Sequence, residues 1–407
     1  LGVVGDPAAD TLRVGYLSLT KAFDGTATGG GTVDLSFTLT NAGPTPAGDL
    51  SFSDDLDAVV PGLLATGLPI AACGGTLLTP DGGSTVVLAG GSLAPAGAPG
   101  DSCSVTVTLS VPIDAPLDTF TNTTGDLLQN GVSVGDPAVA DLEIESAFDF
   151  LKAFQPATIG PGGASRLVLT MTNLETALAE ALAFTDVLPA GMTIATPSSA
   201  STDCLGGVVS APDGGNTISL SNAELGPTET CTVTVSVIGT TTATNVTGEL
   251  SSSIGLGSGA TATLTVDDTR PGFAKAFAPS SIPPGGTSTL TFTIDNTANA
   301  TYVQNLDFTD NLPLGMVIAD PPYAFTDCGT STIPPTLTAD AGTGVVILDA
   351  NGHMAFPAVA AGAACSVTVD VVATAGGELH NVSGELLASY TSSGKASATL
   401  EATVTPL

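Results

Sequence analysis

The sequence is poor in basic residues. Its 407 residues include seven Lys and Arg against 39 Asp and Glu, which gives a formal net charge of −32 at pH 7. Because so acidic a chain repels phosphate backbones and anionic lipid surfaces, we expect no nucleic-acid partner. The chain also lacks any run of about eighteen apolar residues, so we expect no membrane insertion. No basic and apolar leader opens the chain at Leu1; because the paired cysteines described below indicate an exported protein, we expect its signal peptide to have been removed.

Aromatic residues are also scarce. Trp is absent and Phe, Tyr and Trp together make up 4% of the chain, although 43% of the residues are hydrophobic. Val, Leu, Ala and Thr must therefore build the core, and this composition favours thin layers of β-sheet. The 49 Gly and 28 Pro are scattered among apolar alternations, which indicates many turns and short strands.

Residues typical of catalytic sites are few. The chain has two histidines, His353 and His380, and it has no nucleophile elbow, phosphate-binding loop or His/Cys metal spacing. We therefore expect a protein that is not an enzyme. A carboxylate pair for glycoside hydrolysis stays open, since any pair among the 39 acids would be assembled only in space.

One motif occurs three times and sets the organisation of the chain. A lysine, an alanine and a phenylalanine follow one another at Lys21, Lys152 and Lys275, each time before a glycine-rich turn and an alternating strand. These lysines are about 120 to 130 residues apart, so each repeat has the size of a domain.

The alternation inside each repeat predicts β-strands. Val33, Leu35, Phe37 and Leu39 fall on one face of a strand and polar residues on the other, and the later repeats follow the same pattern. Seven to eight such strands in about 120 residues, without helical periodicity, indicate an all-β fold, a Greek-key β-sandwich of immunoglobulin type. Short linkers favour an elongated rod of three tandem sandwiches.

The repeats predict the domain boundaries. We expect repeat 1 at residues 17–146, repeat 2 at 147–268 and repeat 3 at 269–407. Residues 1–16 resemble the closing strand of a preceding module, because Val4-Gly5-Asp6-Pro7 echoes Val134-Gly135-Asp136-Pro137. We expect this extra N-terminal strand to pair along an exposed sheet edge, either within the chain or in a neighbouring subunit.

Several motifs together resemble a known family. They are Lys-x-Phe-x-Pro, Pro-Gly-Gly, Phe-x-Asp-x-Leu-Pro-x-Gly-Met, a cysteine pair and Thr-Asn-x-Thr-Gly, and repeat 1 keeps them least completely. In this combination the chain is similar to the domain-of-unknown-function repeats numbered eleven, and their close relatives, in bacterial and archaeal surface proteins. The resemblance implies tandem immunoglobulin-like domains in large exported proteins, and it implies no activity.

The six cysteines fall two to a repeat. We predict disulfides within each repeat, joining Cys73 to Cys103, Cys204 to Cys231 and Cys328 to Cys365. Regularly placed, even-numbered cysteines indicate an oxidising compartment, so we expect an extracellular or cell-surface location.

A lysine, an aspartate and an asparagine also recur once in each repeat. The sets are Lys21, Asp54 and Asn122; Lys152, Asp186 and Asn245; and Lys275, Asp310 and Asn381. One interpretation is a buried ion pair, with the asparagine serving a turn. The other is an isopeptide bond between the lysine and the asparagine, with the carboxyl group moving protons.

Acidic residues gather near the expected junctions between repeats. Hard cations bind several carboxylate oxygens, so calcium is the one cofactor that we consider. No EF-hand or nonapeptide spacing supports such a site, whose candidate ligands are Asp141, Glu143, Glu145, Asp149, Asp267 and Asp268.

Two classes of function remain. The first is a non-catalytic structural protein, a surface stalk or a fibre or filament subunit, whose partners are copies of itself, assembled head to tail or laterally, or other cell-surface components. The alternative is an adhesin module that binds carbohydrate or protein through its inter-strand loops. Clustered exposed aromatics mark binding faces, and Tyr302 and Tyr323 are the candidate pair.

Overall fold

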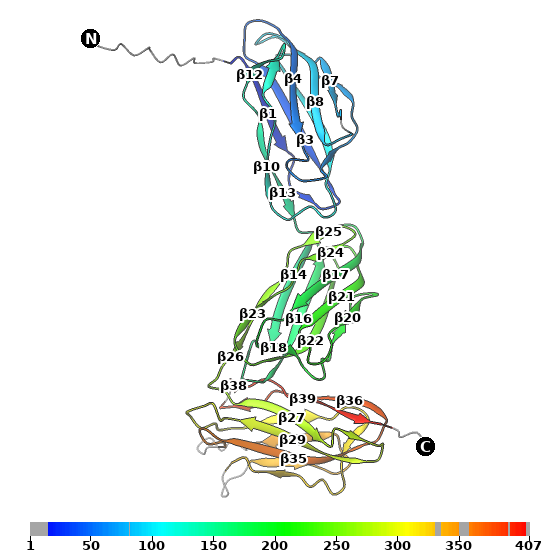
Figure 1. Cartoon of the computed structure of the whole chain (residues 1–407), viewed down its shortest axis with the longest axis vertical. Coiled ribbons are helices and arrows are strands. Elements are labelled where there is room, and N and C mark those ends of the chain that lie inside the picture. The colour runs from blue at the N-terminus through cyan, green and yellow to red at the C-terminus, as the bar shows by residue number, and fades with distance from the viewer. Residues whose placement is uncertain (1–14, 81, 330–334, 350–357, 390, 404–407) are drawn as a thin grey trace, which may run out of the picture. The chain divides into compact units, whose positions relative to one another are not determined.

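The computed structural model describes residues 15–80, 82–329, 335–349, 358–389 and 391–403. Within these ranges every regular element is a β-strand, and each repeat contains thirteen of them (Figure 1). The extra strand predicted for the N-terminus lies almost wholly outside the described residues. In the described part of the chain, no helix is long and apolar enough to cross a membrane.

Repeat 1 is a sandwich of sheets in which all the described strand pairs but one are antiparallel. Its strands are β1 (Leu17–Phe23), β2 (Ala27–Thr28), β3 (Thr32–Asn41), β4 (Ala47–Asp55), β5 (Leu64–Ala65), β6 (Ile70–Ala72), β7 (Gly75–Leu78), β8 (Thr85–Leu93), β9 (Ser102–Ser110), β10 (Thr119–Thr123), β11 (Leu127–Gln129), β12 (Val132–Gly135) and β13 (Val139–Glu145). One sheet has the order β1-β3-β9-β5. The other strands form the sheets β12-β11-β4-β8-β7-β6 and β10-β13-β2.

Repeat 2 has the same plan. Its strands are β14 (Phe148–Gln155), β15 (Thr158–Ile159), β16 (Ala164–Asn173), β17 (Ala179–Val187), β18 (Met192–Ile194), β19 (Ser201–Thr202), β20 (Val208–Ser210), β21 (Thr217–Leu225), β22 (Thr230–Gly239), β23 (Ala243–Val246), β24 (Leu250–Ser252), β25 (Gly255–Gly257) and β26 (Thr261–Val266). The sheet orders are β14-β16-β22-β18, β20-β21-β17-β24-β25 and β15-β26-β23, with β19 also paired to β22.

Repeat 3 follows it closely. Its strands are β27 (Gly272–Ala278), β28 (Ser281–Ile282), β29 (Thr287–Asp295), β30 (Phe308–Asn311), β31 (Met316–Ile318), β32 (Phe325–Thr326), β33 (Thr336–Ala339), β34 (Val345–Asp349), β35 (Ala364–Ala373), β36 (Gly377–Val382), β37 (Leu387–Ala388), β38 (Thr391–Ser392) and β39 (Ser397–Ala402). Its sheets are β27-β29-β35-β31, β28-β39-β36, β30-β34-β33 and β37-β38, with β32 also paired to β35.

The topology is that of a Greek key. In repeat 1, β3 lies between β1 and β9, although the strands β4 to β8 separate β3 from β9 along the chain. The short strand β2 turns away from β1 and pairs in parallel with the closing strand β13, and β15 and β28 do the same with β26 and β39. The first and last long strands are thereby held on the same edge of each sandwich. The fold is three tandem immunoglobulin-like β-sandwiches, as expected.

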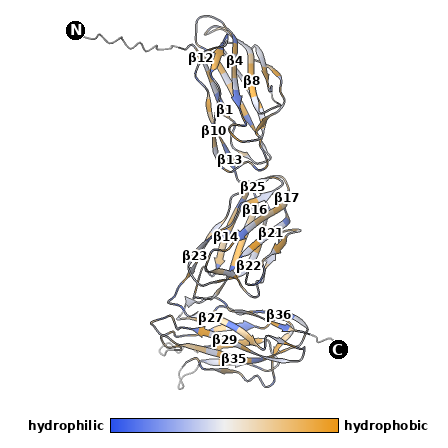
Figure 2. Cartoon of the chain, viewed as in Figure 1, coloured by the Kyte–Doolittle hydropathy of each residue, from blue (hydrophilic) through white to orange (hydrophobic). Residues whose placement is uncertain are grey.

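Alternating apolar residues place the core between the sheets. Leu35, Phe37 and Leu39 are fully buried on one face of β3, while the residues between them are partly exposed. Figure 2 shows hydrophobic residues concentrated in the strands of every repeat. A phenylalanine of the second sheet meets this face at an aromatic contact, with ring centroids 4.9 Å apart for Phe37 and Phe52 and 4.7 Å for Phe292 and Phe308.

The strands are more numerous than the seven or eight predicted. Most of the additional strands are only two to four residues long, such as β2, β5 and β15. The prediction also missed an irregularity in β4 and β17, where the pairing with β8 and β21 shifts register. Asp49, Ala181 and Asn305 lie at equivalent positions five residues before the recurring aspartate, and all three have positive φ. Backbone in this region is uncommon for residues with a side chain and accompanies bulges, which apolar alternation does not reveal.

The chain forms two compact units, Leu1–Ala147 with Ser253–Gly257, and Phe148–Ser252 with Ser258–Leu407. Repeats 2 and 3 belong to the same unit. The boundaries expected at residues 146 and 268 stay a prediction.

Candidate functional site

The recurring lysine, aspartate and asparagine come together inside each sandwich. In repeat 1, Lys21 lies on β1, Asp54 on β4 and Asn122 on β10, which belong to three different sheets. Asp54 follows Phe52 by two residues and therefore shares its inward face. We call each set of three residues a triad.

The first triad is fully enclosed. The Lys21 Nζ lies 3.2 Å from Asp54 Oδ1 and 3.3 Å from Oδ2, and both side chains are 0% exposed. The Asn122 Nδ2 donates to Asp54 Oδ2 over 3.1 Å. The carboxyl group of Asp54 is thus the shared partner of the lysine and the asparagine.

In the second triad both nitrogens approach one oxygen. The Lys152 Nζ lies 2.9 Å from Asp186 Oδ2, and Asn245 Nδ2 donates to the same atom over 3.0 Å. The two nitrogens therefore cannot be further apart than the sum of these distances. Asp186 Oδ1 is buried and has no hydrogen-bond partner, although the ion pair itself is intact.

The third triad uses the two carboxyl oxygens separately. The Lys275 Nζ lies 3.0 Å from Asp310 Oδ1, while Asn381 Nδ2 donates to Asp310 Oδ2 over 2.8 Å. The ammonium also lies 5.5 Å from the ring centroid of Phe292, a cation–π distance. An aromatic ring therefore forms one side of this triad.

Burial is the largest influence on the pKa values of the three lysines and of Asp54. Loss of solvent lowers the pKa of Lys21, Lys152 and Lys275, and the neighbouring carboxylate only partly opposes the effect. For Lys275 the pKa falls to about 8. Burial likewise raises the pKa of Asp54 in spite of the attraction of Lys21. The enclosure thus favours the neutral forms of the lysines and of this carboxyl group.

The asparagine oxygens are left without partners. In all three repeats the amide Nδ2 donates to the aspartate, while the buried Oδ1 of Asn122, Asn245 and Asn381 accepts no hydrogen bond. A buried polar atom without a partner is costly, and here it recurs at one position in three copies.

The structure also places the cysteines in pairs within each repeat. The disulfides are Cys73–Cys103, Cys204–Cys231 and Cys328–Cys365, with Cα atoms 5.5, 5.0 and 5.0 Å apart. In repeats 2 and 3 the first cysteine follows β19 or β32, which pairs with the strand of the second cysteine. In repeat 1 it follows β6 of the opposite sheet, so this disulfide joins the two layers.

Comparison with known proteins identifies the repeats. Residues 18–144, 149–266 and 271–402 each match one family model, described as a domain of unknown function, DUF7933. The chain belongs to the DUF7933 family. A relation to the repeats numbered eleven stays a prediction, since the matched family carries a different number. No curated protein matches the sequence.

Similar solved structures share little identity with these DUF7933 repeats. The collagen adhesin of S. aureus is 11% identical, with 63% of this chain and 94% of that one covered and a TM-score of 0.24. The Escherichia coli adhesin FdeC is 14% identical, with 98% and 100% covered and a TM-score of 0.19. A red sea bream transglutaminase is 11% identical, with 63% of this chain covered and a TM-score of 0.34; the chain spans about a third of its length, 32%.

The acids considered for calcium are not brought together in the DUF7933 repeats. Within the described residues, groups of three ligand atoms within 4.8 Å occur only at Asp203 and Asp327, each beside the two sulfurs of a disulfide. The candidate acids have other partners or face solvent: Asp141 accepts from Thr121, and Glu145 from Thr26. Glu143, Asp149 and Asp268 are exposed. Calcium binding stays a prediction.

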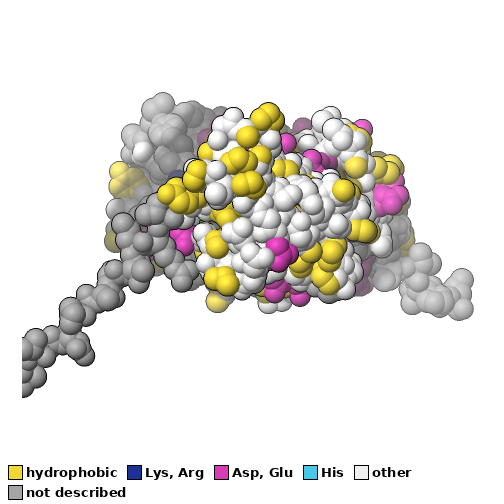
Figure 3. Space-filling view, turned by 90° about the horizontal axis from the view of Figure 1, so that it is seen from above, with side chains coloured by type: hydrophobic (Ala, Val, Ile, Leu, Met, Phe, Trp, Pro, Cys, Tyr) yellow, Lys and Arg dark blue, Asp and Glu magenta, His cyan; other side chains and the backbone are white. Residues whose placement is uncertain are grey.

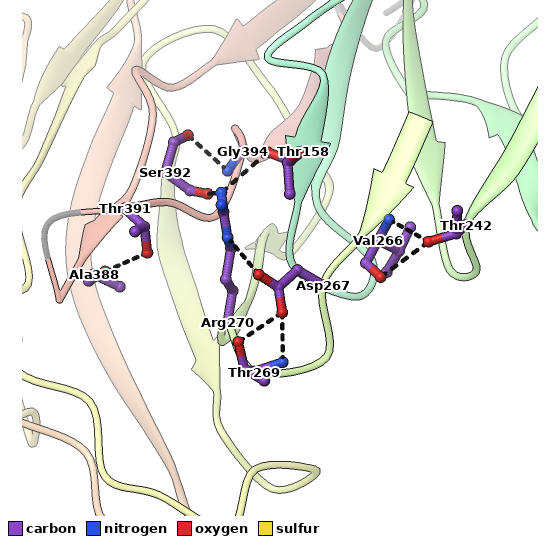
Figure 4. Close-up of polar contacts among 10 residues, drawn as sticks. All are labelled: Thr158, Thr242, Val266, Asp267, Thr269, Arg270, Ala388, Thr391, Ser392 and Gly394. Atoms are coloured by element: carbon purple, nitrogen blue, oxygen red, sulfur yellow. Dashed lines mark hydrogen bonds and ion pairs between the residues drawn. The ribbon is translucent and has the colours of Figure 1, made fainter. Parts of the chain in front are cut away.

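Asp267 belongs instead to an arginine contact between repeats 2 and 3 (Figure 4). The Arg270 Nε donates to Asp267 Oδ2 over 3.1 Å, while its Nη1 donates to the carbonyl oxygens of Thr158 and Ser392. Hydrogen bonds from Thr269, and then the charge of Arg270, lower the pKa of Asp267. This carboxylate is therefore held ionised by its own linker.

A second recurring asparagine closes a turn in every repeat. Asn173 Nδ2 donates to the carbonyls of Ala177 and Leu225, and its Oδ1 accepts from the backbone of Glu175. Asn41 and Asn296 make equivalent bonds. In the sequence these asparagines recur at the end of the alternating strand, a position suited to a turn, but recurrence does not reveal the bridge to a distant loop.

Proposed function

We propose that this chain is a non-catalytic structural element of the cell exterior, a segment of a surface stalk or of a fibre. The observation that supports it is the repetition of one internally stapled sandwich. Each of the three repeats buries the same lysine, aspartate and asparagine and holds its own disulfide. A spacer made of repeats works only if every repeat resists unfolding, so each repeat is expected to keep the same internal crosslinks.

The disulfides support the extracellular location, since such bonds persist in oxidising compartments. The surface of the chain is acidic. On the face shown in Figure 3, acidic side chains are spread among uncharged ones and Lys and Arg are hardly visible. A net charge of −32 keeps neighbouring chains soluble before assembly. The partners we propose are copies of this chain or other cell-surface components.

Immunogold electron microscopy of the source cells tests the proposal, with antibodies raised against the purified chain. We expect label along fibres or stalks outside the cell, at a spacing that follows the repeats. Label confined to the cell interior would overturn it.

An adhesin is the second candidate, because repeat 3 exposes aromatic side chains. Tyr302 is 55% exposed, Tyr323 70% and Phe325 59%. Aromatic residues are enriched where proteins bind carbohydrate or protein partners. A glycan array probed with the wild-type chain and with Tyr323→Ala separates the two functions: binding that this substitution abolishes favours the adhesin.

A further inference from the structure

We propose that each repeat joins its lysine to its asparagine through an amide bond that the buried triad forms by itself. The bonds link Lys21 to Asn122, Lys152 to Asn245 and Lys275 to Asn381. This modification goes beyond the structural role, because the disulfides and buried ion pairs that support that role require no amide bond.

Each triad holds its lysine and its asparagine in positions suited to a reaction between them. The nucleophile and the amide meet at one carboxyl group, most closely in repeat 2, where both nitrogens lie 2.9 to 3.0 Å from Asp186 Oδ2. All three groups are enclosed, so water is kept from competing with the lysine. Holding the reactants together replaces a slow encounter with a step inside one fold.

The environment favours the reactive protonation states. A lysine attacks only as the neutral amine, and burial lowers the pKa of Lys275 to about 8. A neutral carboxyl group can donate to an amide oxygen, and burial raises the pKa of Asp54. In repeat 1, where burial lowers the pKa of Lys21 and raises the pKa of Asp54, the enclosure that makes an ion pair costly thus favours the neutral pair.

The unpartnered asparagine oxygens fit this chemistry. Turning each amide by half a turn exchanges its Nδ2 and Oδ1, and the oxygen then lies where the nitrogen now lies, 2.8 to 3.1 Å from the aspartate. Only a protonated carboxyl group can donate to it there. That hydrogen bond satisfies the buried Oδ1 and polarises the carbonyl carbon toward attack.

The reaction balances without a further reagent. The lone pair of the lysine Nζ forms a bond to Cγ of the asparagine. The neutral aspartate first gives its proton to Oδ1, then takes a proton from the attacking nitrogen and passes it to the departing Nδ2. When the carbonyl re-forms, Oδ1 returns its proton to the carboxylate, so the aspartate ends protonated, as it began. The Cγ–Nδ2 bond breaks and one ammonia leaves.

The bond changes how the repeat carries load. In repeat 1 it joins β1, the first strand, to β10, which lies beside the closing strand β13. Tension that enters at β1 passes directly to β10 and β13. The intervening strands, and the disulfide at Cys73 and Cys103 among them, then bear none of it.

Intact-mass spectrometry of the full chain, expressed in an oxidising compartment and then reduced, tests the proposal. We expect a mass lower than that of the sequence by three ammonia molecules. Lys152→Arg, Asp186→Ala and Asn245→Ala should each restore one ammonia, while Lys395→Arg, which changes the lysine outside the triads, should restore none. Deamidation is distinguished because it replaces the amide nitrogen by oxygen and changes the mass differently.

If a variant does not fold, peptide mapping of the wild-type chain still tests for the amide bond. Linked peptides that contain Lys152 and Asn245 support the proposal. A wild-type mass equal to that of the sequence, with no ammonia lost, would overturn it and leave three buried ion pairs.

Discussion

Lys275 and Asp310 form an ion pair that is closed to solvent: Nζ and Oδ1 are 3.0 Å apart, and both side chains are 0% exposed. Such a pair stabilises a fold little, because the cost of removing two charges from water offsets their attraction. It recurs in all three repeats at the positions of Lys21 and Lys152. We attribute this costly arrangement to the amide-forming reaction proposed above.

The first prediction concerns pH and the variant Asn381→Ala, which keeps the ion pair but cannot form the amide. A base whose pKa is lowered on folding binds fewer protons in the folded than in the unfolded state between the two pKa values. With Lys275 at about 8 against 10.5, the free energy of unfolding should rise between these pH values, by about 3 kcal/mol in all. Calorimetry from pH 7 to 10 measures the rise.

The wild-type chain is the control, because an amide nitrogen does not titrate. We expect its third repeat to show no such rise. The same pH dependence in both proteins would contradict the bond at Lys275.

The second prediction concerns the disulfide of repeat 2. Replacing both Cys204 and Cys231 by Ser removes a crosslink between residues 27 positions apart. The chain-entropy model gives a loss of about 3 kcal/mol for a loop of this size. Calorimetry should show one of the thermal transitions lowered and the others unchanged. Recovery of peptides linked between repeats, on mapping without reduction, would show that the pairing is wrong.

The third prediction concerns the turn asparagine of repeat 2. Asn173→Ala leaves the carbonyls of Ala177 and Leu225 without their donor, and we expect a cost of about 2 to 4 kcal/mol. Hydrogen exchange should increase in residues 173–178 and 225–229. Asn216→Ala removes an exposed asparagine of the same repeat and should change stability by less than about 0.5 kcal/mol. Equal effects of the two substitutions would contradict a structural role for Asn173.

The fourth prediction concerns the linker at Arg270. Arg270→Ala removes the donors to Thr158 and Ser392, so we expect faster proteolysis within residues 267–272. Arg166→Ala removes an exposed arginine and should leave the rate unchanged. An unchanged rate for Arg270→Ala as well would show that the contact does not restrain the linker.

The sequence predicted the sandwiches because two signals agree at the long strands that begin each repeat. Alternation at Leu35, Phe37 and Leu39 identified the buried face, and threefold recurrence aligned it with the other repeats. Recurrence of the scarce lysines also singled out the triads, since Lys21, Lys152 and Lys275 occupy one position.

Other features could not be predicted from alternation or recurrence. The bulges at Asp49 and Ala181 depend on backbone angles that non-glycine residues seldom adopt, so the residue types at these positions do not predict them. The first cysteine of repeat 1 follows a strand of the opposite sheet, whereas those of repeats 2 and 3 follow strands paired with the strand of the second cysteine; this difference depends on the local path of the chain. Within the described residues the acids considered for calcium form no close group, because Asp141 and Glu145 accept hydrogen bonds from different threonines; calcium binding itself stays a prediction.

Single-molecule pulling of the full chain with its disulfides reduced tests most directly whether each repeat carries load through its triad. With the bonds present, a repeat releases only the residues outside the lysine-to-asparagine span, about 20 to 30 residues or roughly 70 to 100 Å. Lys152→Arg should convert one of these events into the release of a whole repeat, about 400 Å at full extension. Three wild-type events of about 400 Å each would contradict a covalent load path.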